Sequence, residues 1–135
     1  IEALAARRAA ELGAERAAKA GPALIDAGRR AVDSGSVPKM IAADIKFHEF
    51  VYALSGNPLI APALETQLTY TQRVMGEVLV RDEQPRDIWD QHAAILQAIA
   101  DGDGARAEKL MHTHLMQAAG YMVKRLRGRA AEAAA

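Results

Sequence analysis

Apolar residues recur along this chain at every third or fourth position, which is the spacing of one buried face of an α-helix. Clusters of glycine, proline and small polar residues interrupt the pattern at 21–22, 33–35, 55–58 and 101–104. Glycine and proline end helices, while serine, aspartate and asparagine cap the helices that follow. The pattern therefore predicts a series of helices separated by short turns.

Six helical segments follow from these interruptions. Proline is tolerated only in the first turn of a helix, so Gly21-Pro22 is expected to end the first segment. Gly56 is expected to take a left-handed conformation and Asn57 to cap the next helix, while Asp103 caps the last one. Residues 81–86 are predicted to form a polar loop. The predicted segments are 1–19, 23–32, 37–54, 58–79, 87–100 and 104–127.

Short loops place consecutive helices antiparallel, so the predicted fold class is all-α, an antiparallel helical bundle of about six to seven helices. A length of 135 residues suits one domain. That domain is expected to cover residues 1–128, and the tail at 129–135 is expected to fray because it has nothing to bury. The chain has no initiator methionine and opens directly into a helical pattern, so it is expected to be a fragment.

Composition and charge exclude some classes of protein. The formal net charge is zero, which argues against binding of nucleic acid by this segment alone. The absence of cysteine excludes disulfides and thiolate metal sites. No apolar run approaches the roughly 20 residues of a membrane span, and no signal peptide is expected. A cytoplasmic location is therefore expected.

Four polar residues occupy positions on the apolar stripes where a bundle would bury leucine or isoleucine: Asp44, His48, His92 and His114. Buried polar groups are costly unless they are paired. One aspartate and three imidazoles cannot all satisfy one another, but one divalent cation can satisfy all four. These residues are therefore predicted to bind a metal ion.

The spacing supports this metal set, although a simpler interpretation exists. Asp44 and His48 are four positions apart and project from one side of a helix, while His92 and His114 come from two other helices. One carboxylate and three imidazoles suit Zn(II) first, with Ni(II), Mn(II) or Fe(II) as alternatives. The simpler interpretation is three independent core histidines and a capping aspartate. His112, on the charged side of its helix, is assigned to solvent.

Two further residues are candidates for ligand binding. Arg73 interrupts an apolar helix face, and arginine grips planar carboxylates with two parallel hydrogen bonds. Its alternative role is a surface salt bridge, for example with Glu77. Tyr52 lies one turn beyond His48 and is expected to line the same cavity, or else to belong to the core with its hydroxyl at the edge.

The motifs of this chain also resemble a known family. They are Asp44-x-x-x-His48, then Ser55-Gly56-Asn57-Pro58-Leu59, then His92-x-x-Ile95-x-x-Ala98-Ile99-x-x-Gly102-Asp103, then Ala107-x-x-x-Met111-x-x-His114-Leu115. In this order they resemble the FCD domain, the C-terminal effector-binding domain of FadR-subfamily GntR transcription regulators. The resemblance covers essentially the whole chain.

The resemblance implies a homodimeric helical regulator that binds a divalent cation through Asp44, His48, His92 and His114. It implies a small carboxylate or sugar-acid effector bound against the metal. It also implies an N-terminal winged helix-turn-helix domain that binds DNA, and no such domain is found in these 135 residues. The domain is then not an enzyme.

The alternative is a mononuclear metal-dependent hydrolase or oxygenase in a helical bundle. No credible general base lies near the expected ligands, and the paired Glu-x-x-His motifs of di-iron bundles do not occur.

Overall fold

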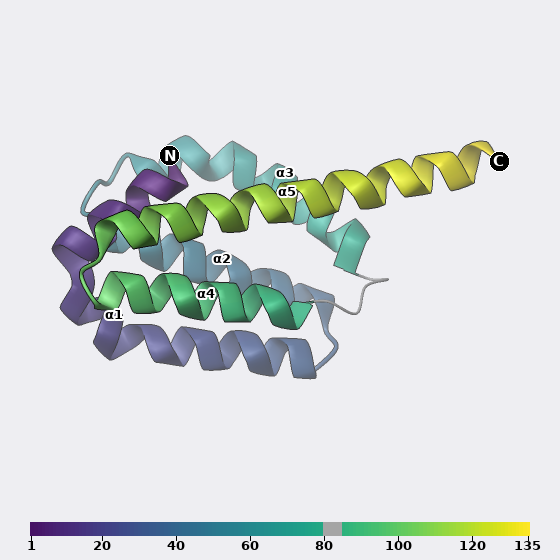
Figure 1. Ribbon diagram of the computed structural model, residues 1–135. Coiled ribbons are helices and arrows are strands. Elements are labelled where there is room, and N and C mark those ends of the chain that lie inside the picture. Colours follow the sequence, from purple (N-terminus) through teal and green to yellow (C-terminus); the bar gives the residue numbers. More distant parts are fainter. Residues whose placement is uncertain (80–84) are drawn as a thin grey trace.

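The computed structural model describes residues 1–79 and 85–135, which form a bundle of five helices (Figure 1). No strand occurs in the described part of the chain, so the predicted all-α class is confirmed. The prediction of six to seven helices exceeds the number found. The helices are α1 (Glu2–Asp33), α2 (Val37–Leu54), α3 (Ile60–Leu79), α4 (Pro85–Ala100) and α5 (Gly104–Ala134).

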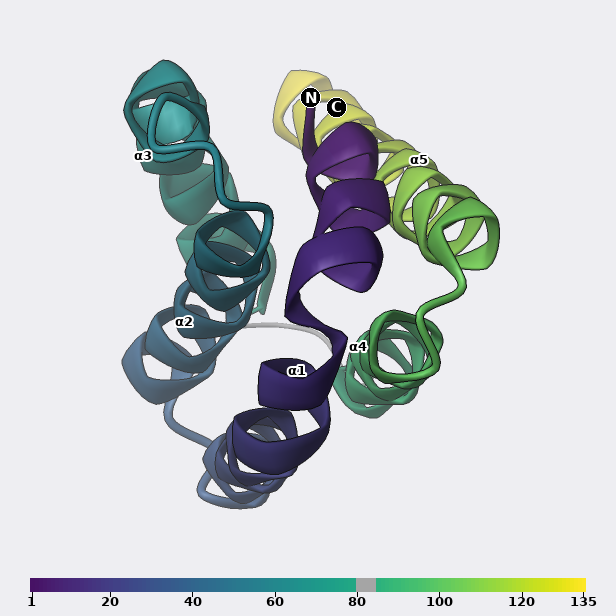
Figure 2. The same ribbon diagram turned by 90° about the vertical axis from the view of Figure 1, so that its left-hand side faces the viewer.

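The predicted helix break at Gly21-Pro22 was wrong. Pro22 lies inside α1, so the two segments predicted on either side of it form one helix. Figures 1 and 2 show that α1 changes direction partway along its length instead of ending. Ala17, Gly21 and Ile25 are buried on either side of the proline. Packing against the bundle thus outweighs the loss of one backbone hydrogen bond.

The predicted turns at 33–35, 55–58 and 101–104 are present, although α3 begins at Ile60, two residues later than predicted. Gly35, Gly56 and Gly102 have positive φ angles of 68°, 69° and 72°, which glycine adopts without a steric penalty. The Asp103 carboxylate caps α5 by accepting a hydrogen bond of 3.0 Å from the Arg106 N–H. Helix α4 begins two residues earlier than predicted and so includes the last two residues of the predicted loop at 81–86. The rest of that loop lies outside the described residues.

The C-terminal helix is longer than predicted. Helix α5 continues to Ala134 through the segment that was expected to fray, and its residues beyond 127 are all exposed. Figure 1 shows this end of α5 extending past the other helices.

The helices surround a core into which α1 contributes mainly alanine. Viewed end-on, α2, α3, α4, α5 and the second half of α1 form a ring, and the first half of α1 closes one end of it (Figure 2). Buried Ala6, Ala9, Ala10 and Ala17 allow α1 to approach α2, α4 and α5 closely. No described helix is long and apolar enough to cross a membrane. The largest fully buried apolar side chains are Phe47, Val51, Tyr52, Ile95, Ile99 and Met111.

Candidate metal centre

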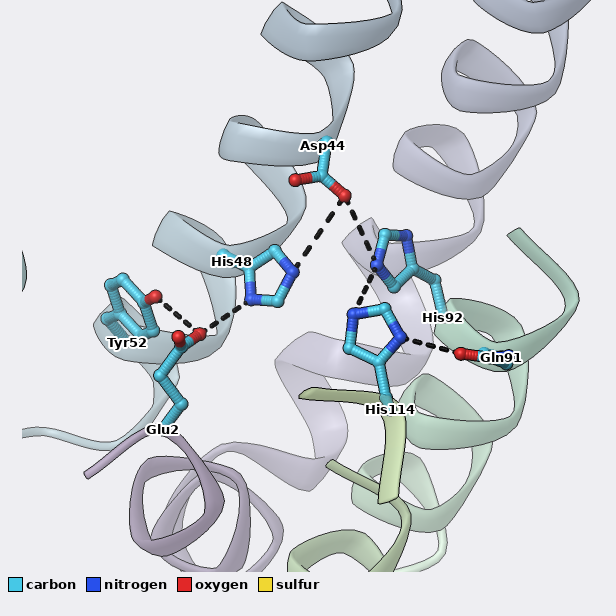
Figure 3. A network of polar contacts seen from close by, with 7 residues as sticks. All are labelled: Glu2, Asp44, His48, Tyr52, Gln91, His92 and His114. Atoms are coloured by element: carbon cyan, nitrogen blue, oxygen red, sulfur yellow. Dashed lines mark hydrogen bonds and ion pairs between the residues drawn. The ribbon is translucent and has the colours of Figure 1, made fainter. Parts of the chain in front are cut away.

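Three histidines from three helices meet inside the bundle, beside one aspartate (Figure 3). His48 and Asp44 come from α2, His92 from α4 and His114 from α5. One ring nitrogen from each histidine lies within 4.8 Å of the others. The His92 Nε2 atom is 3.3 Å from His114 Nε2 and 3.4 Å from Asp44 Oδ1, which is also 3.9 Å from His48 Nε2. The structure therefore brings all four sequence-predicted ligands together.

Hydrogen bonds on the far side of its ring orient His48. Its Nδ1 atom lies 2.8 Å from Glu2 Oε2, and the same oxygen accepts a 2.6 Å hydrogen bond from the Tyr52 hydroxyl. Burial raises the pKa of Glu2, but its contacts with His48 and Tyr52 outweigh this effect and hold the pKa below its usual value. Glu2 is thus an ionised acceptor, so His48 donates from Nδ1 and directs Nε2 toward the cluster.

A second hydrogen-bonded chain orients His114. The Gln91 side chain donates to Gln117 Oε1 at 3.1 Å, which leaves its own Oε1 to accept. The Nδ1 atom of His114 lies 2.8 Å from this oxygen and is therefore the donor. His114 consequently presents the lone pair of Nε2 to the cluster.

Packing rather than hydrogen bonding orients His92. Its ring stacks on Phe47 with centroids 4.2 Å apart and meets Trp89 edge-on at 4.7 Å. The Nδ1 atom of His92 is buried and has no hydrogen-bond partner among the described residues. This ring is fully buried, and two aromatic neighbours fix its plane.

Burial also controls the charge of the cluster. It lowers the pKa of His92 well below its usual value, and it lowers that of His114 to about 4, with the nearby charge of His48 adding to both effects. Both rings are therefore neutral near pH 7, the state in which imidazole binds metals. Burial raises the pKa of Asp44 despite the opposing charge of His48, so its carboxylate gains from a nearby cation.

The donor set fits a single divalent cation of the first transition series. Zinc, nickel, manganese and iron bind imidazole and carboxylate ligands, with bonds of roughly 2.0–2.2 Å for zinc. Two atoms on opposite sides of such an ion are then at most about 4.4 Å apart. The distances of 3.3, 3.4 and 3.9 Å within the cluster match that span. A cation here would also supply the charge that buried Asp44 needs.

A cavity of about 310 Å³ adjoins the cluster, and residues from all five helices line it. Asp44, His48, His114 and Glu2 line it on the side of the cluster. Gln67 and Thr71 contribute polar groups from α3, and the remaining lining is apolar. The candidate metal centre therefore has an adjoining space for a small molecule.

The other predicted residues do not line this cavity. Arg73 is exposed, because two positions after Thr71 a helix has turned by about 200° and points the side chain away from the cavity. The Tyr52 hydroxyl is buried and donates to Glu2, so it supports His48 rather than facing the cavity. His112 is exposed, whereas its neighbour His114 belongs to the cluster.

Sequence reasoning missed two supporting residues, Glu2 and Gln91. Glu2 precedes buried Ala5, Ala6 and Ala9 at helical spacing, so an acid on an alanine stripe was the available signal. Gln91 directly precedes His92 and carries no signal of its own, because its role depends on the approach of α5.

Comparison with known protein families identifies the family of this chain. The sequence profile of the FCD domain matches residues 1–117, which is most of the chain. A comparison with curated proteins gives no match. The matched segment contains all four clustered residues and both supporting residues. The chain therefore belongs to the FCD domain family, the effector-binding domains of GntR-type regulators.

Proposed function

We propose that this domain senses a small carboxylate through a divalent cation held by His48, His92, His114 and Asp44. The observation that carries the proposal is the convergence of three imidazoles from three helices beside a cavity. Glu2 and Gln91 support it, because each accepts the Nδ1 proton of one histidine and leaves Nε2 for a metal. Zinc is the first candidate ion, followed by nickel, manganese and iron.

The cation would serve as a binding site for an anion. Four protein ligands leave room on a six-coordinate ion for a carboxylate and a neighbouring hydroxyl group of the effector. Gln67 and Thr71 are placed to hydrogen-bond the rest of the molecule from α3. Arg73 is exposed and away from the cavity, so the proposal gives the anchoring role to the metal instead.

Effector binding would act on DNA binding through the helix positions. Glu2 lies in the first turn of α1, at the end of the domain where an N-terminal winged helix-turn-helix domain would join. Its contact with His48 links that turn to the metal centre. A ligand that favours one arrangement of His48 and α3 would therefore shift the population of arrangements of a DNA-binding domain. The regulator would act as a homodimer in the cytoplasm.

The test combines metal analysis with thermal unfolding of the purified protein. About one divalent ion per chain is expected, and chelation should lower the melting temperature because the ion binds the folded state. Small hydroxycarboxylic acids should raise the melting temperature of the metal-loaded protein alone. An unchanged melting curve after verified removal of the metal would contradict the metal site, and acids that act equally without metal would contradict the binding mode.

A further inference from the structure

The cavity beside the metal centre has two unlike sides. Its ionisable side chains are gathered at the cluster, while α3 contributes only the neutral polar groups of Gln67 and Thr71. No arginine or lysine occurs among the described residues that line it. The rest of the lining consists of hydrocarbon and thioether groups, chiefly Leu64, Leu68, Met75, Leu115, Met116 and Met122.

The charges at the cluster leave little attraction for a multiply charged ligand. An ion of charge +2 with neutral imidazoles is already balanced by the carboxylates of Asp44 and Glu2, both of which line the cavity. One ligand carboxylate bound to the ion brings the site to a net charge of −1. A second carboxylate would lie among leucine and methionine side chains without a cationic partner, which is costly.

The apolar walls also disfavour a polyhydroxylated ligand. Each hydroxyl group that loses water must find a hydrogen-bond partner, because an unpaired buried hydroxyl group is costly. Beyond the cluster, only Gln67 and Thr71 offer such partners among the described lining residues. A sugar acid carries more hydroxyl groups than these two side chains can serve.

From this arrangement we infer that the effector is a small monocarboxylate with a hydrocarbon body, either branched or aromatic. The inference rests on the proposed function and narrows its carboxylate to one class. The carboxylate lies at the metal, and the body packs against the leucines and methionines. A volume of about 310 Å³ is at the lower end of the roughly 300–1,000 Å³ of ligand sites, which limits the size of the body. Methionine side chains adapt in shape, so related bodies should bind.

The experiment compares acids that share the same metal-binding group. Calorimetric titration of the zinc-loaded protein would use 2-hydroxy-4-methylpentanoate, malate and gluconate, each of which has a hydroxyl group next to a carboxylate. We expect the first acid to bind at least about tenfold more tightly than the other two, because it alone leaves no charge or excess hydroxyl group in the apolar part. Chelation of the zinc should abolish its binding.

A charge placed in the cavity provides a matched test. Met116 lines the cavity yet is 62% exposed, so Met116→Arg is expected to fold. It should increase the affinity for malate relative to 2-hydroxy-4-methylpentanoate by about tenfold, since it adds the missing cationic partner. Val123→Arg adds the same charge on the same helix at a position that is 45% exposed and does not line the cavity, and it should leave the ratio unchanged.

The outcomes separate the inference from the function on which it rests. Tighter binding of malate or gluconate by the metal-loaded wild-type protein would overturn the hydrocarbon body and leave the metal-dependent sensor standing. An equal shift in both arginine variants would overturn the placement of the ligand body in this cavity. Failure of every acid to bind zinc-loaded protein would overturn the proposed function, and the inference with it.

Discussion

The two sides of this bundle are packed in different ways. Where α1 meets α4, a Cβ atom added at Gly28 would collide with the Trp89 ring, and one added at Gly21 would collide with Leu96. On α3, a Cβ atom at Gly76 would meet only Ile41 Cδ1 at 4.0 Å among the described residues. Helix α3 packs on α2 and more weakly on α5, and the 310 Å³ cavity lies beside it.

The candidate metal centre lies on the border between these two sides. His92 faces the closed side, where Phe47 and Trp89 enclose it. His48 and His114 line the cavity on the open side. A sensor of a small molecule needs both sides: a rigid side that fixes a metal-binding side chain, and an open side that admits the small molecule. The comparison predicts that equivalent substitutions have unequal effects on the two sides.

The largest effect is expected for His92→Ala. This change removes a metal ligand and also leaves a cavity between Phe47 and Trp89, at a cost of roughly 2–5 kcal/mol in the free energy of unfolding. His114→Ala should also lose the metal, but its metal-free protein should be less destabilised because His114 already borders open space. Metal analysis and urea unfolding of the metal-free variants measure both effects.

His112→Ala is the matched control on α5. Its side chain is exposed, so metal content and stability should both stay at the wild-type level. Equal metal in the His92 and His112 variants would remove His92 from the metal centre. Equal destabilisation of the His92 and His114 variants would erase the difference between the two sides.

Glycine-to-alanine substitutions should differ in sign between the two sides. Gly28→Ala forces a methyl group against the rigid Trp89 ring and should destabilise the protein by about 1–3 kcal/mol. Gly76→Ala meets no such obstacle and should stabilise the protein by about 0.5–1 kcal/mol, as alanine does in a helix. Unfolding in urea gives both values. A stabilising Gly28→Ala would show that the approach of α1 to α4 is looser than described.

Removing the charge of the Glu2 carboxylate should have a moderate effect, mainly on metal affinity and less on the stability of the fold. Glu2→Gln keeps the size and one acceptor oxygen but removes the negative charge beside His48. Metal affinity should fall by about 10- to 100-fold, the range for such supporting residues. Tyr52→Phe removes only the hydrogen bond to Glu2 and should cause a smaller loss. Competition with a metal-binding dye measures both, and an unchanged affinity for Glu2→Gln would refute the supporting role.

The smallest effect is expected for Arg73→Ala. The exposed guanidinium points away from the cavity, so metal content and stabilisation by carboxylates should not change. Thr71→Val, on the cavity face of the same helix, should weaken carboxylate binding by about 0.5–1.5 kcal/mol if the ligand uses this hydroxyl group. Thermal shifts with a fixed acid compare the two variants. A loss confined to Arg73→Ala would restore the arginine as the anchor.

The sequence predicted the fold where local chemistry decides the backbone. Gly35, Gly56 and Gly102 stand at the turns, and Asp103 caps α5, because each effect acts within a few residues. It failed at Pro22, where burial of α1 against distant helices overrides a local signal. Packing between segments far apart in the chain leaves no trace in a local pattern.

The candidate site divides in the same way. Asp44, His48, His92 and His114 were identifiable because each is a polar residue on an apolar helix face. Arg73 is exposed and does not line the cavity, because two positions along a helix reverse the direction of a side chain, so its role in ligand binding stays a prediction. Gln91 could not be found, since its partner His114 lies 23 positions away.

The wide separation of the clustered residues has a kinetic consequence. His48 lies 44 positions before His92 and 66 positions before His114, so a bound ion would join helices that meet only after long segments of the chain have closed into loops. Contacts of this kind form late in folding, and they must break before the helices can separate. The ion would therefore slow unfolding far more than it speeds folding. In a cell, the folded domain would then last longer with the metal bound than without it.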